Sequence, residues 1–391
     1  MNIVYLSPHF PPNYYLFSVN LKKMGANVLG IADVSYDELR NELKDAITEY
    51  YRVDNMEDYD QLLRACGYFT HAYGKIDHIE SHNEYWLETE AKLRTDFNIP
   101  GTKSHQVARI TRKSEMKNLF QKAGVEVARG KVTKNLESAK KLVLETGYPV
   151  ICKPDRGVGA ANTFMINNDK ELNAFFAEKG QIQYSQIRYM MEEFIEGDIY
   201  SFDGLTDRDS NIVFYTSHVF NRGIMETVNK DRDIFYYSLR DIPEDLENAG
   251  INTVKAFHIR GKFFHVEFFR TKDNRLIGLE MNARPPGGLT TDMFNFANNI
   301  DVYKEWANIV VNNKFEASYT RPYHCGYIGR KLNKNYINSH RAIMQNFGHL
   351  IVYHGPIDSV FSAAIGNYAY LANSADMEGI TKAAKFIQDT I

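Results

Sequence analysis

The sequence predicts a mixed α/β and α+β chain: an N-terminal α/β domain, a two-subdomain α+β fold and a small C-terminal lobe. Three observations lead to this prediction. The 391 residues exceed the size of one small domain and leave room for several cores. Strand and helix patterns alternate over the first hundred residues. Strand patterns then dominate between about residues 189 and 288, and the pattern is mixed beyond about residue 315.

The N-terminal domain is placed at residues 1–105 and ends near an Ile-Pro-Gly turn. A buried strand, NIVYLS, is followed by a helical stretch and a second strand, ANVLGIAD. Further helical segments are expected around residues 36–49 and 57–65. Strands separated by helices predict a parallel sheet with crossover connections.

The next module is placed at residues 106–188. It contains an amphipathic helix over 114–123, closed by Gly124, and then the apolar strand PVICKP. A loop at 155–163 precedes a helix near 169–178. The remaining modules are a strand-rich subdomain at 189–315 and a C-terminal lobe at 316–391.

Composition narrows the class of protein. A net charge of −3 and the absence of any run of five Lys or Arg argue against a nucleic-acid partner. The start, MNIVYLSPHF, does not resemble a signal peptide, and no apolar run approaches a membrane-spanning length of ~20 residues. Three scattered cysteines without a Cys-x-x-Cys pair predict no zinc knuckle and fit a reduced, cytoplasmic setting.

Two sequence motifs that commonly form nucleotide-binding loops are absent from the sequence. The first strand is followed by Ser7-Pro8-His9 and not by Gly-x-Gly-x-x-Gly, which argues against an NAD-dependent oxidoreductase. The stretch Gly101-Thr102-Lys103-Ser104 resembles the end of a Walker A loop but lacks its upstream glycine. A bound nucleotide must therefore be held in another way.

The most informative stretch is HVEFFRTKDNRLIGLEMNARPPGG, residues 265–288. It predicts a β-hairpin around the polar turn KDNR. A four-residue loop would place Thr271 opposite Leu276, and the same register places Glu267 opposite Glu280. The hairpin therefore brings two carboxylates together.

Asn282 and Arg284 follow Glu280 at alternate positions, so they are expected on the same face of the sheet. Carboxylates directly opposite each other destabilise a sheet, and a cation between them removes that penalty. Oxygen ligands of this kind suit Mg²⁺. The guanidinium of Arg284 would then hold a phosphoryl group or a carboxylate.

Two lysines are candidate phosphate ligands. Lys153 ends the apolar strand and precedes a loop with Gly157 and Gly159, whose small residues let backbone approach phosphate. Lys113 lies at the start of the amphipathic helix. A third segment, MEEFIEG at 191–197, offers backbone groups and acids for an adenine and a ribose.

In this order, the features resemble the ATP-grasp superfamily, in motif detail over about residues 106–310 and in domain order over the whole chain. The most specific element is Glu280-x-Asn282-x-Arg284 with Glu267 upstream. The resemblance implies that ATP lies between two α+β subdomains. It also implies that the two glutamates and the asparagine ligate one or two Mg²⁺ ions, with Mn²⁺ as an alternative. Residues 1–105 would be the preceding α/β domain, which helps to bind the acceptor carboxylate.

The resemblance also implies roles for single positions. Arg284 would stabilise the acyl-phosphate transition state. Lys113 and Lys153 would contact the phosphates, and the loop from Gly157 to Thr163 would form a lid over them. Glu192 would accept a hydrogen bond from the adenine amino group, and the backbone of Glu193 and Ile195 would contact the adenine edge. Asp198, or Glu196, would bind the ribose.

Among the branches, the chain resembles L-amino-acid ligases and carbamoyl-phosphate-synthase-like members. Arg284 is followed by Pro-Pro-Gly-Gly and not by the Gln-x-Glu-His of biotin carboxylases, which argues against bicarbonate and biotin as substrates. The implied activity is an ATP-dependent carboxylate–amine ligase that works through an acyl phosphate and releases ADP and phosphate. A small carboxylate or amino acid and an amine would be its substrates, and a homodimer is compatible. Two alternatives stay open: another nucleophile such as a thiol, and a non-catalytic ATP-binding module.

Two segments have no fixed role at this point. Glu84 lies after an expected strand end and is a candidate for holding a substrate amine. We favour a simpler hypothesis, a capping box in which Ser81 begins a helix and Glu84 closes it. The charged stretch at 222–232 is a candidate site lining of unknown role.

Overall fold

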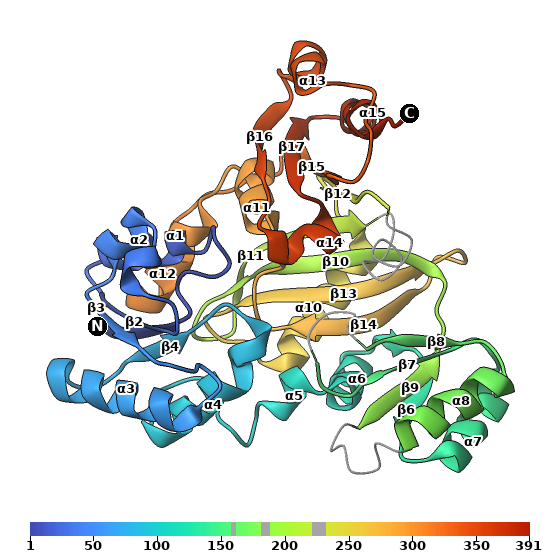
Figure 1. Cartoon of the computed structure of the whole chain (residues 1–391), viewed down its shortest axis with the longest axis horizontal. Coiled ribbons are helices and arrows are strands. Elements are labelled where there is room, and N and C mark those ends of the chain that lie inside the picture. The colour runs from blue at the N-terminus through green and yellow to red at the C-terminus, as the bar shows by residue number, and fades with distance from the viewer. Residues whose placement is uncertain (158–161, 181–187, 221–231) are drawn as a thin grey trace.

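The computed structural model describes residues 1–157, 162–180, 188–220 and 232–391. Three β-sheets organise these residues (Figure 1). A four-stranded sheet lies near the N-terminus, a second four-stranded sheet follows it, and a nine-stranded sheet extends from the middle of the chain into the C-terminal lobe.

The N-terminal sheet is parallel, as predicted, and its strand order is β3-β2-β1-β4. One expectation is corrected: the helical stretch expected over 36–49 contains only short helical segments, and β3 begins at Glu49. The residues Glu-Tyr-Tyr-Arg pair along β2, because aromatic side chains favour a half-buried strand. The elements are β1 (Asn2–Leu6), α1 (Tyr15–Lys23), β2 (Asn27–Ala32), η1 (Tyr36–Glu38), α2 (Asn41–Ala46), β3 (Glu49–Arg52), α3 (Tyr59–Tyr73), β4 (His78–Glu80), η2 (Glu84–Trp86) and α4 (Leu87–Asp96).

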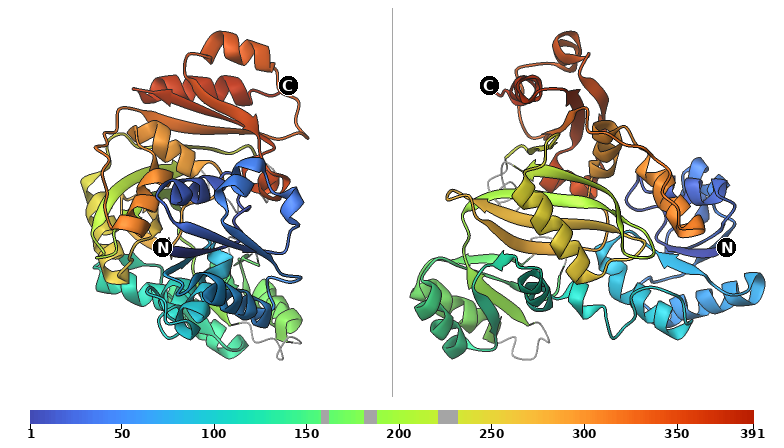
Figure 2. Two further views of the ribbon diagram at one scale, coloured as in Figure 1. Left: turned by 90° about the vertical axis from the view of Figure 1, so that its left-hand side faces the viewer. Right: turned by 180° about the vertical axis from the view of Figure 1, so that it is seen from behind.

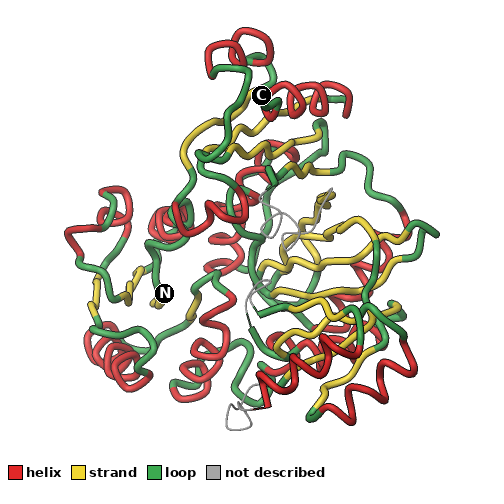
Figure 3. The backbone as a smooth tube through the Cα atoms, turned by 45° about the vertical axis from the view of Figure 1, so that its right-hand side comes forward, coloured by secondary structure: helices red, strands yellow, loops and turns green. Residues whose placement is uncertain are grey.

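The second sheet is antiparallel, with the order β6-β9-β7-β8. Its helices pack on one face through a core that includes Leu142, Cys152 and Met191. Figure 3 shows these helices beside the strands. Since β9 belongs to this sheet, a boundary after residue 193 fits the sheets better than the predicted one at 188. The elements are β6 (Gly130–Thr133), α7 (Leu136–Thr146), β7 (Val150–Pro154), β8 (Phe164–Ile166), α8 (Asp169–Gly180) and β9 (Tyr189–Glu193).

The nine-stranded sheet has the order β16-β17-β15-β12-β11-β10-β13-β14-β5. Its strands join the C-terminal lobe to the strand-rich subdomain in one continuous sheet. The strands are β5 (Glu126–Val127), β10 (Gly197–Thr206), β11 (Ile212–Phe220), β12 (Phe235–Ser238), β13 (Phe263–Thr271), β14 (Leu276–Asn282), β15 (His324–Arg330), β16 (Ile351–Pro356) and β17 (Tyr368–Ser374).

A helix that the sequence analysis missed covers one face of this sheet. Helix α10 (Glu244–Phe257) interrupts the region expected to be strand-like, and Figure 2 shows it lying across β10 and β13. Pro243 precedes three acidic residues in its first turn, and its buried residues recur at helical spacing. Short strand patterns on both sides concealed this signal.

The remaining helices pack at the ends and edges of the large sheet. The predicted amphipathic helix is confirmed as α6, which ends before Gly124. In the part of the chain that the structure describes, no helix has the length and hydropathy needed to cross a bilayer. These helices are α5 (Ala108–Thr111), α6 (Lys113–Lys122), α11 (Thr290–Asn298), α12 (Val302–Asn312), α13 (His340–Phe347), η3 (Ser359–Phe361), α14 (Ser362–Ile365) and α15 (Met377–Gln388).

The N-terminal domain docks on the large subdomain through a shared aromatic core. Phe17 of α1 packs edge-on against Tyr303 and Trp306 of α12, with ring centroids 4.8 and 5.2 Å apart. The fold therefore brings the carboxyl ends of the parallel strands close to the segment that follows β14.

Candidate active site

The β13–β14 hairpin pairs the two glutamates as predicted, but the strand register near the turn differs from the prediction. Arg270, and not Thr271, lies opposite Leu276, while Glu267 lies opposite Glu280 as predicted. A β-bulge between these two pairs reconciles the registers. The turn is one residue longer than expected, and Asn274 within it adopts a left-handed conformation (φ 65°), which asparagine tolerates.

The bulge decides which face carries the carboxylates. Val266 and Met281 pair with each other and belong to the core beneath α10. Glu267, Glu280 and Asn282 therefore point to the opposite face, which is turned toward the viewer in Figure 1. Without the extra residue in β14, the strand alternation would direct Glu280 toward α10.

The residues on this face suit a cation. The side-chain oxygen Oδ1 of Asn282 is buried and has no hydrogen-bond partner within the described residues. Burial raises the pKa of Glu280, and the nearby carboxylates of Glu84 and Glu267 add to this rise against the opposing charge of Lys113. An unpartnered carbonyl oxygen beside crowded carboxylates is the donor set that Mg²⁺ prefers. The described residues contain no group of three or more His, Cys, Asp or Glu side chains placed for a metal, so this set depends on the asparagine.

Arg284 meets a carboxylate from the N-terminal domain. Its Nη2 atom lies 2.8 Å from Oε2 of Glu84, 200 residues away in sequence, and its Nη1 donates to the Pro285 carbonyl at 2.9 Å. Both side chains are largely buried, with 19% and 10% exposure. The favoured capping-box hypothesis for Glu84 is therefore wrong: Asn83 caps η2 by accepting from the Tyr85 amide at 3.0 Å.

The turn after Arg284 is also fixed by the N-terminal domain. The Tyr14 hydroxyl donates to the Pro286 carbonyl at 3.1 Å, and the Asn13 amide donates to Asp292 at 2.9 Å and to the Gly288 carbonyl at 3.3 Å. Asn13 follows β1 and Glu84 follows β4, so both come from the carboxyl edge of the parallel sheet, where open α/β sheets bind ligands. Burial raises the pKa of Asp292 to about 6.

The two predicted phosphate lysines lie near the same face. Lys113 Nζ lies 2.9 Å from Glu280 Oε1 and donates to the Gly157 carbonyl at 3.3 Å. Asp155 accounts for this proximity, because its backbone carbonyl and carboxylate accept from the Lys113 and Ser114 amides at 2.8 and 2.9 Å. The start of α6 is therefore capped by the residue that begins the glycine loop.

Lys153 pairs with Glu192 across the second sheet. Lys117, one turn after Lys113 on α6, lies 2.8 Å from the other oxygen of Glu192. Burial by itself would raise the pKa of Glu192, but the charges of Lys153 and Lys117 outweigh burial and lower it to about 2. Lys117 was not singled out from the sequence, although its i, i+4 spacing from Lys113 was a usable signal.

Comparison with known proteins identifies the family to which this part of the chain is similar. Residues 146–292 match a family described as an ATP-grasp domain. Residues 146–292 therefore form an ATP-grasp domain. The L-arginine-specific L-amino acid ligase of Bacillus subtilis is 26% identical over 242 residues, which are 61% of this chain and 58% of that protein. The carbamoyl phosphate synthase large chain of Agathobacter rectalis is 25% identical over 201 residues, 50% of this chain and 18% of that protein.

A solved structure extends the likeness over the whole fold. The L-amino acid ligase from Bacillus licheniformis superposes with a TM-score of 0.75 at 15% identity, covering 99% of this chain and 96% of that one. The predicted superfamily and its fold class are confirmed. The matches to both curated relatives cover less than two thirds of their own lengths.

Of the residues predicted to contact adenine and ribose, the structure brings only some close to the two lysines. In the ATP-grasp fold of this chain, Glu192 lies with the lysines, whereas the Glu193 side chain pairs outward with Arg129 at 2.7 Å. Ile195 follows β9 in a loop. Asp198 lies opposite Arg270, whose guanidinium pairs with Asp245 of α10, so the register places Asp198 on the face away from Glu267. Glu196, the alternative, is exposed and pairs with Lys272 at 2.6 Å.

Two predicted features lie outside the described residues. Gly159 falls in the gap at 158–161, and the charged stretch at 222–232 falls almost wholly in the gap at 221–231. The ATP-grasp lid expected from Gly157 to Thr163 is therefore described only at its two ends.

A polar network on the face that carries Glu267, Glu280 and Asn282, here called the metal face, was missed by sequence reasoning. His265 Nδ1 lies 2.5 Å from Asp203, and its Nε2 lies 3.6 Å from Glu267. Burial opposes protonation of His265, but Asp203 and Glu267 outweigh burial and raise its pKa to about 10. The signal was available: His265 precedes Glu267 by two positions on one strand face.

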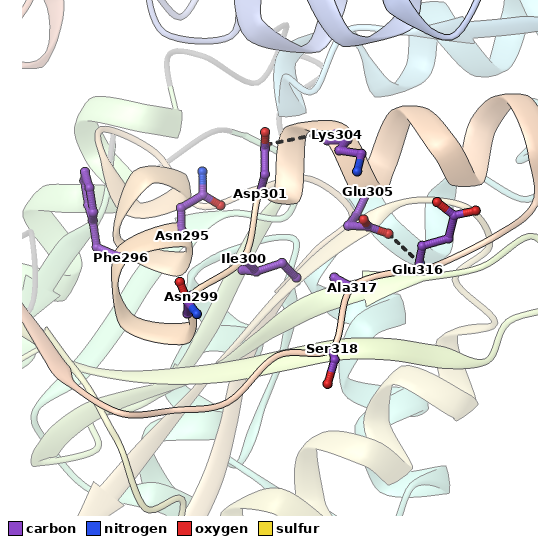
Figure 4. A pocket seen from close by; sticks show the side chains of 10 residues that line it. All are labelled: Asn295, Phe296, Asn299, Ile300, Asp301, Lys304, Glu305, Glu316, Ala317 and Ser318. Atoms are coloured by element: carbon purple, nitrogen blue, oxygen red, sulfur yellow. Dashed lines mark hydrogen bonds between the residues drawn. The ribbon is translucent and has the colours of Figure 1, made fainter.

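A separate pocket lies among residues of α11, α12 and the segment that follows α12 (Figure 4). Its volume is about 430 Å³, and Glu305 accepts from the Glu316 amide at 2.8 Å inside it. None of the predicted site residues lines this pocket.

Proposed function

We propose that the chain is an ATP-dependent carboxylate–amine ligase that acts through an acyl phosphate and releases ADP and phosphate. The observation that carries the proposal is the buried contact between Arg284 and Glu84, next to the face formed by Glu267, Glu280 and Asn282. In the proposed mechanism, Arg284 would bind phosphate, the face with Glu267, Glu280 and Asn282 would bind a metal ion, and Glu84 would supply an acid from the N-terminal domain. The relation to L-amino acid ligases supports an amino acid as one substrate.

Glu267, Glu280 and Asn282 would hold Mg²⁺, and Mn²⁺ would fit the same oxygen ligands. The ion would neutralise charge on the phosphate oxygens during transfer. Lys113 contacts Glu280 directly. A metal ion bound at that carboxylate would replace this contact, so the Lys113 ammonium group would be free to bind a phosphate.

Lys153 and Gly157 would contact the phosphates, and Glu192 would accept from the adenine amino group. The backbone of Glu193 and Ile195 would meet the adenine edge. For the ribose, the loop at 194–196, with Glu196, is a better placed candidate than Asp198.

The reaction would proceed in two steps. A substrate carboxylate attacks the γ-phosphate of ATP, so that an acyl phosphate forms and ADP leaves. An amine then attacks the acyl carbon, and phosphate leaves from the tetrahedral intermediate. Arg284 would stabilise the negative charge of both steps. Glu84 would orient Arg284 or hold the ammonium group of an amino acid substrate.

The test is phosphate release from ATP and Mg²⁺ in the presence of pools of amino acids and small carboxylates, with mass spectrometry of the products. Release that requires two substrates and yields their summed mass minus water supports the proposal. ADP formation that requires a thiol would favour the other nucleophile. Nucleotide binding without turnover in every pool would favour the non-catalytic module. The Glu280→Gln variant is the matched control and should release no phosphate above background.

A cytoplasmic location is also part of the proposal. The three cysteines are buried and free, and burial raises the pKa of the Cys152 thiol to about 12, which suits packing in a reducing cytoplasm. A homodimer is proposed by resemblance only, and light scattering of the purified chain tests it.

A further inference from the structure

A group of buried polar side chains lies beside the proposed metal ligand Glu267, on the same face of the sheet. Asp203 of β10 is fully buried and accepts hydrogen bonds from three directions. His265 Nδ1 lies 2.5 Å from its Oδ1, while His218 Nδ1 and the Ser201 hydroxyl lie 2.8 and 2.5 Å from its Oδ2. A buried carboxylate requires such partners, because burial without them is costly.

The strand register explains why this group reaches the metal face. Asp203 lies opposite His265 on β13, and His265 lies opposite Asn282 on β14. Ser201 lies opposite Glu267 in the same ladder. All these side chains share one face of the sheet, so His265 has Glu267 beside it on its own strand and Asn282 across from it.

The two histidines differ in what their second ring nitrogen contacts. Nε2 of His265 lies 3.6 Å from Oε1 of Glu267. Nε2 of His218 is buried and has no hydrogen-bond partner in the part of the chain that the structure describes. Both rings are anchored on Asp203, but only His265 connects that anchor to a proposed ligand.

We propose that His265 is a positioning residue: Asp203 fixes its ring, and the ring orients one oxygen of Glu267 so that the other faces the bound metal. This inference rests on the metal site of the proposed function. Groups that orient metal ligands typically contribute 10–100-fold to metal affinity. A strand already fixes the backbone of Glu267, so His265 would fix the remaining freedom of the side chain.

The experiment measures Mn²⁺ binding to the full chain in the presence of ADP by electron paramagnetic resonance, and ADP binding without metal by calorimetry. Asparagine suits the substitution, because its amide nitrogen occupies a place close to that of Nδ1 and nothing replaces Nε2. His265→Asn therefore keeps a donor for Asp203 and removes the contact with Glu267. His218→Asn is the matched control, since it also keeps the Asp203 contact and removes a ring nitrogen that has no hydrogen-bond partner among the described residues.

We expect His265→Asn to weaken Mn²⁺ binding about 10-fold or more, with metal-free ADP affinity unchanged. His218→Asn should bind Mn²⁺ like the wild type. Equal Mn²⁺ affinity of wild type and His265→Asn, or equal losses in both histidine variants, would overturn the positioning role. So would a parallel loss of metal-free ADP binding, which would indicate general damage to the site.

The design separates this inference from the proposed function. If the wild-type chain with ADP binds no Mn²⁺, or if Glu280→Gln binds it as well as the wild type, the proposed metal site itself is wrong and the role of His265 is overturned with it. If the wild type binds Mn²⁺, Glu280→Gln does not, and His265→Asn is unaffected, the metal site stands and only the positioning role is overturned.

Discussion

At the scale of the residue, the contact between Arg284 and Glu84 defines the proposed reaction centre. A buried guanidinium needs a partner, and the structure supplies it from a separate domain. In the proposed mechanism, the Glu84 carboxylate would hold the guanidinium where charge develops in both chemical steps. An arginine fixed in this way stabilises a transition state without rearranging during the reaction.

Arg284→Ala should lower turnover ~100-fold or more, the scale of losing one oxyanion donor. Product formation measured by mass spectrometry checks this, with Arg260→Ala on the exposed surface as the matched control. Undiminished turnover in Arg284→Ala would exclude the proposed role.

A second residue-scale prediction concerns pH. The folded-state pKa of Glu192 is lowered to about 2 from its ordinary value of 4.5, so its contribution to stability is full above pH 4.5 and is lost as the pH falls toward 2. A tenfold change in a carboxyl group's acid dissociation constant corresponds to about 1.4 kcal/mol. Glu192→Gln should therefore flatten the pH dependence of the unfolding free energy between pH 4.5 and 2.

Urea unfolding at several pH values measures this dependence. Glu137→Gln is the control, because Glu137 is 76% exposed and pairs with the exposed Lys141. A wild-type slope in Glu192→Gln would show that the lysines do not stabilise the charged carboxylate.

At the scale of the element, the bulged hairpin determines which side chains meet. The bulge in β14 directs Glu280 to the metal face while Met281 stays in the core beneath α10. Gly278 lies just before the bulge, and a Cβ atom there would lie 2.6 Å from the ring of Phe120. The strand can lie this close to α6 because the glycine has no side chain.

Gly278→Ala should destabilise the protein by about 1–3 kcal/mol, because the added methyl overpacks the contact with Phe120. Chemical denaturation measures the change. Gly67→Ala in α3 is the control: nothing lies within 4 Å of its added methyl, so helix propensity predicts unchanged or higher stability. Equal stability of wild type and Gly278→Ala would mean that α6 moves away without cost.

At the scale of the whole molecule, a buried ionic cluster joins the N-terminal domain to the large sheet. Lys262 Nζ lies 2.7 Å from Glu80 and 3.0 Å from Glu90, and Arg94 lies 2.8 Å from Glu90. Glu80 ends β4, four residues before Glu84. The cluster therefore fixes the segment that carries Glu84 toward Arg284.

Lys262→Met should destabilise the protein by about 3–5 kcal/mol, because two buried carboxylates lose their shared cation. Thermal and urea unfolding measure this loss. Lys272→Ala is the matched control, since Lys272 is 81% exposed in its pair with Glu196 and surface pairs contribute little. A loss below about 1 kcal/mol in Lys262→Met would show that the aromatic core alone holds the domains together.

The sequence by itself determined the parallel N-terminal sheet, helix α6 and the pairing of Glu267 with Glu280. Each depends on short-range alternation or helical spacing, which the order of residues contains directly. It also determined the ATP-grasp superfamily, because the metal-face residues and Arg284 lie within 18 positions of one another.

Only the tertiary structure decided the rest. The bulge before Glu280, helix α10 and the placement of Asp198 away from Glu267 depend on packing between elements that local patterns do not record. The partner of Arg284 and the anchor of His265 lie 200 and 62 residues away in sequence. Burial makes such long-range partners necessary, but it does not determine from the sequence which ones they are.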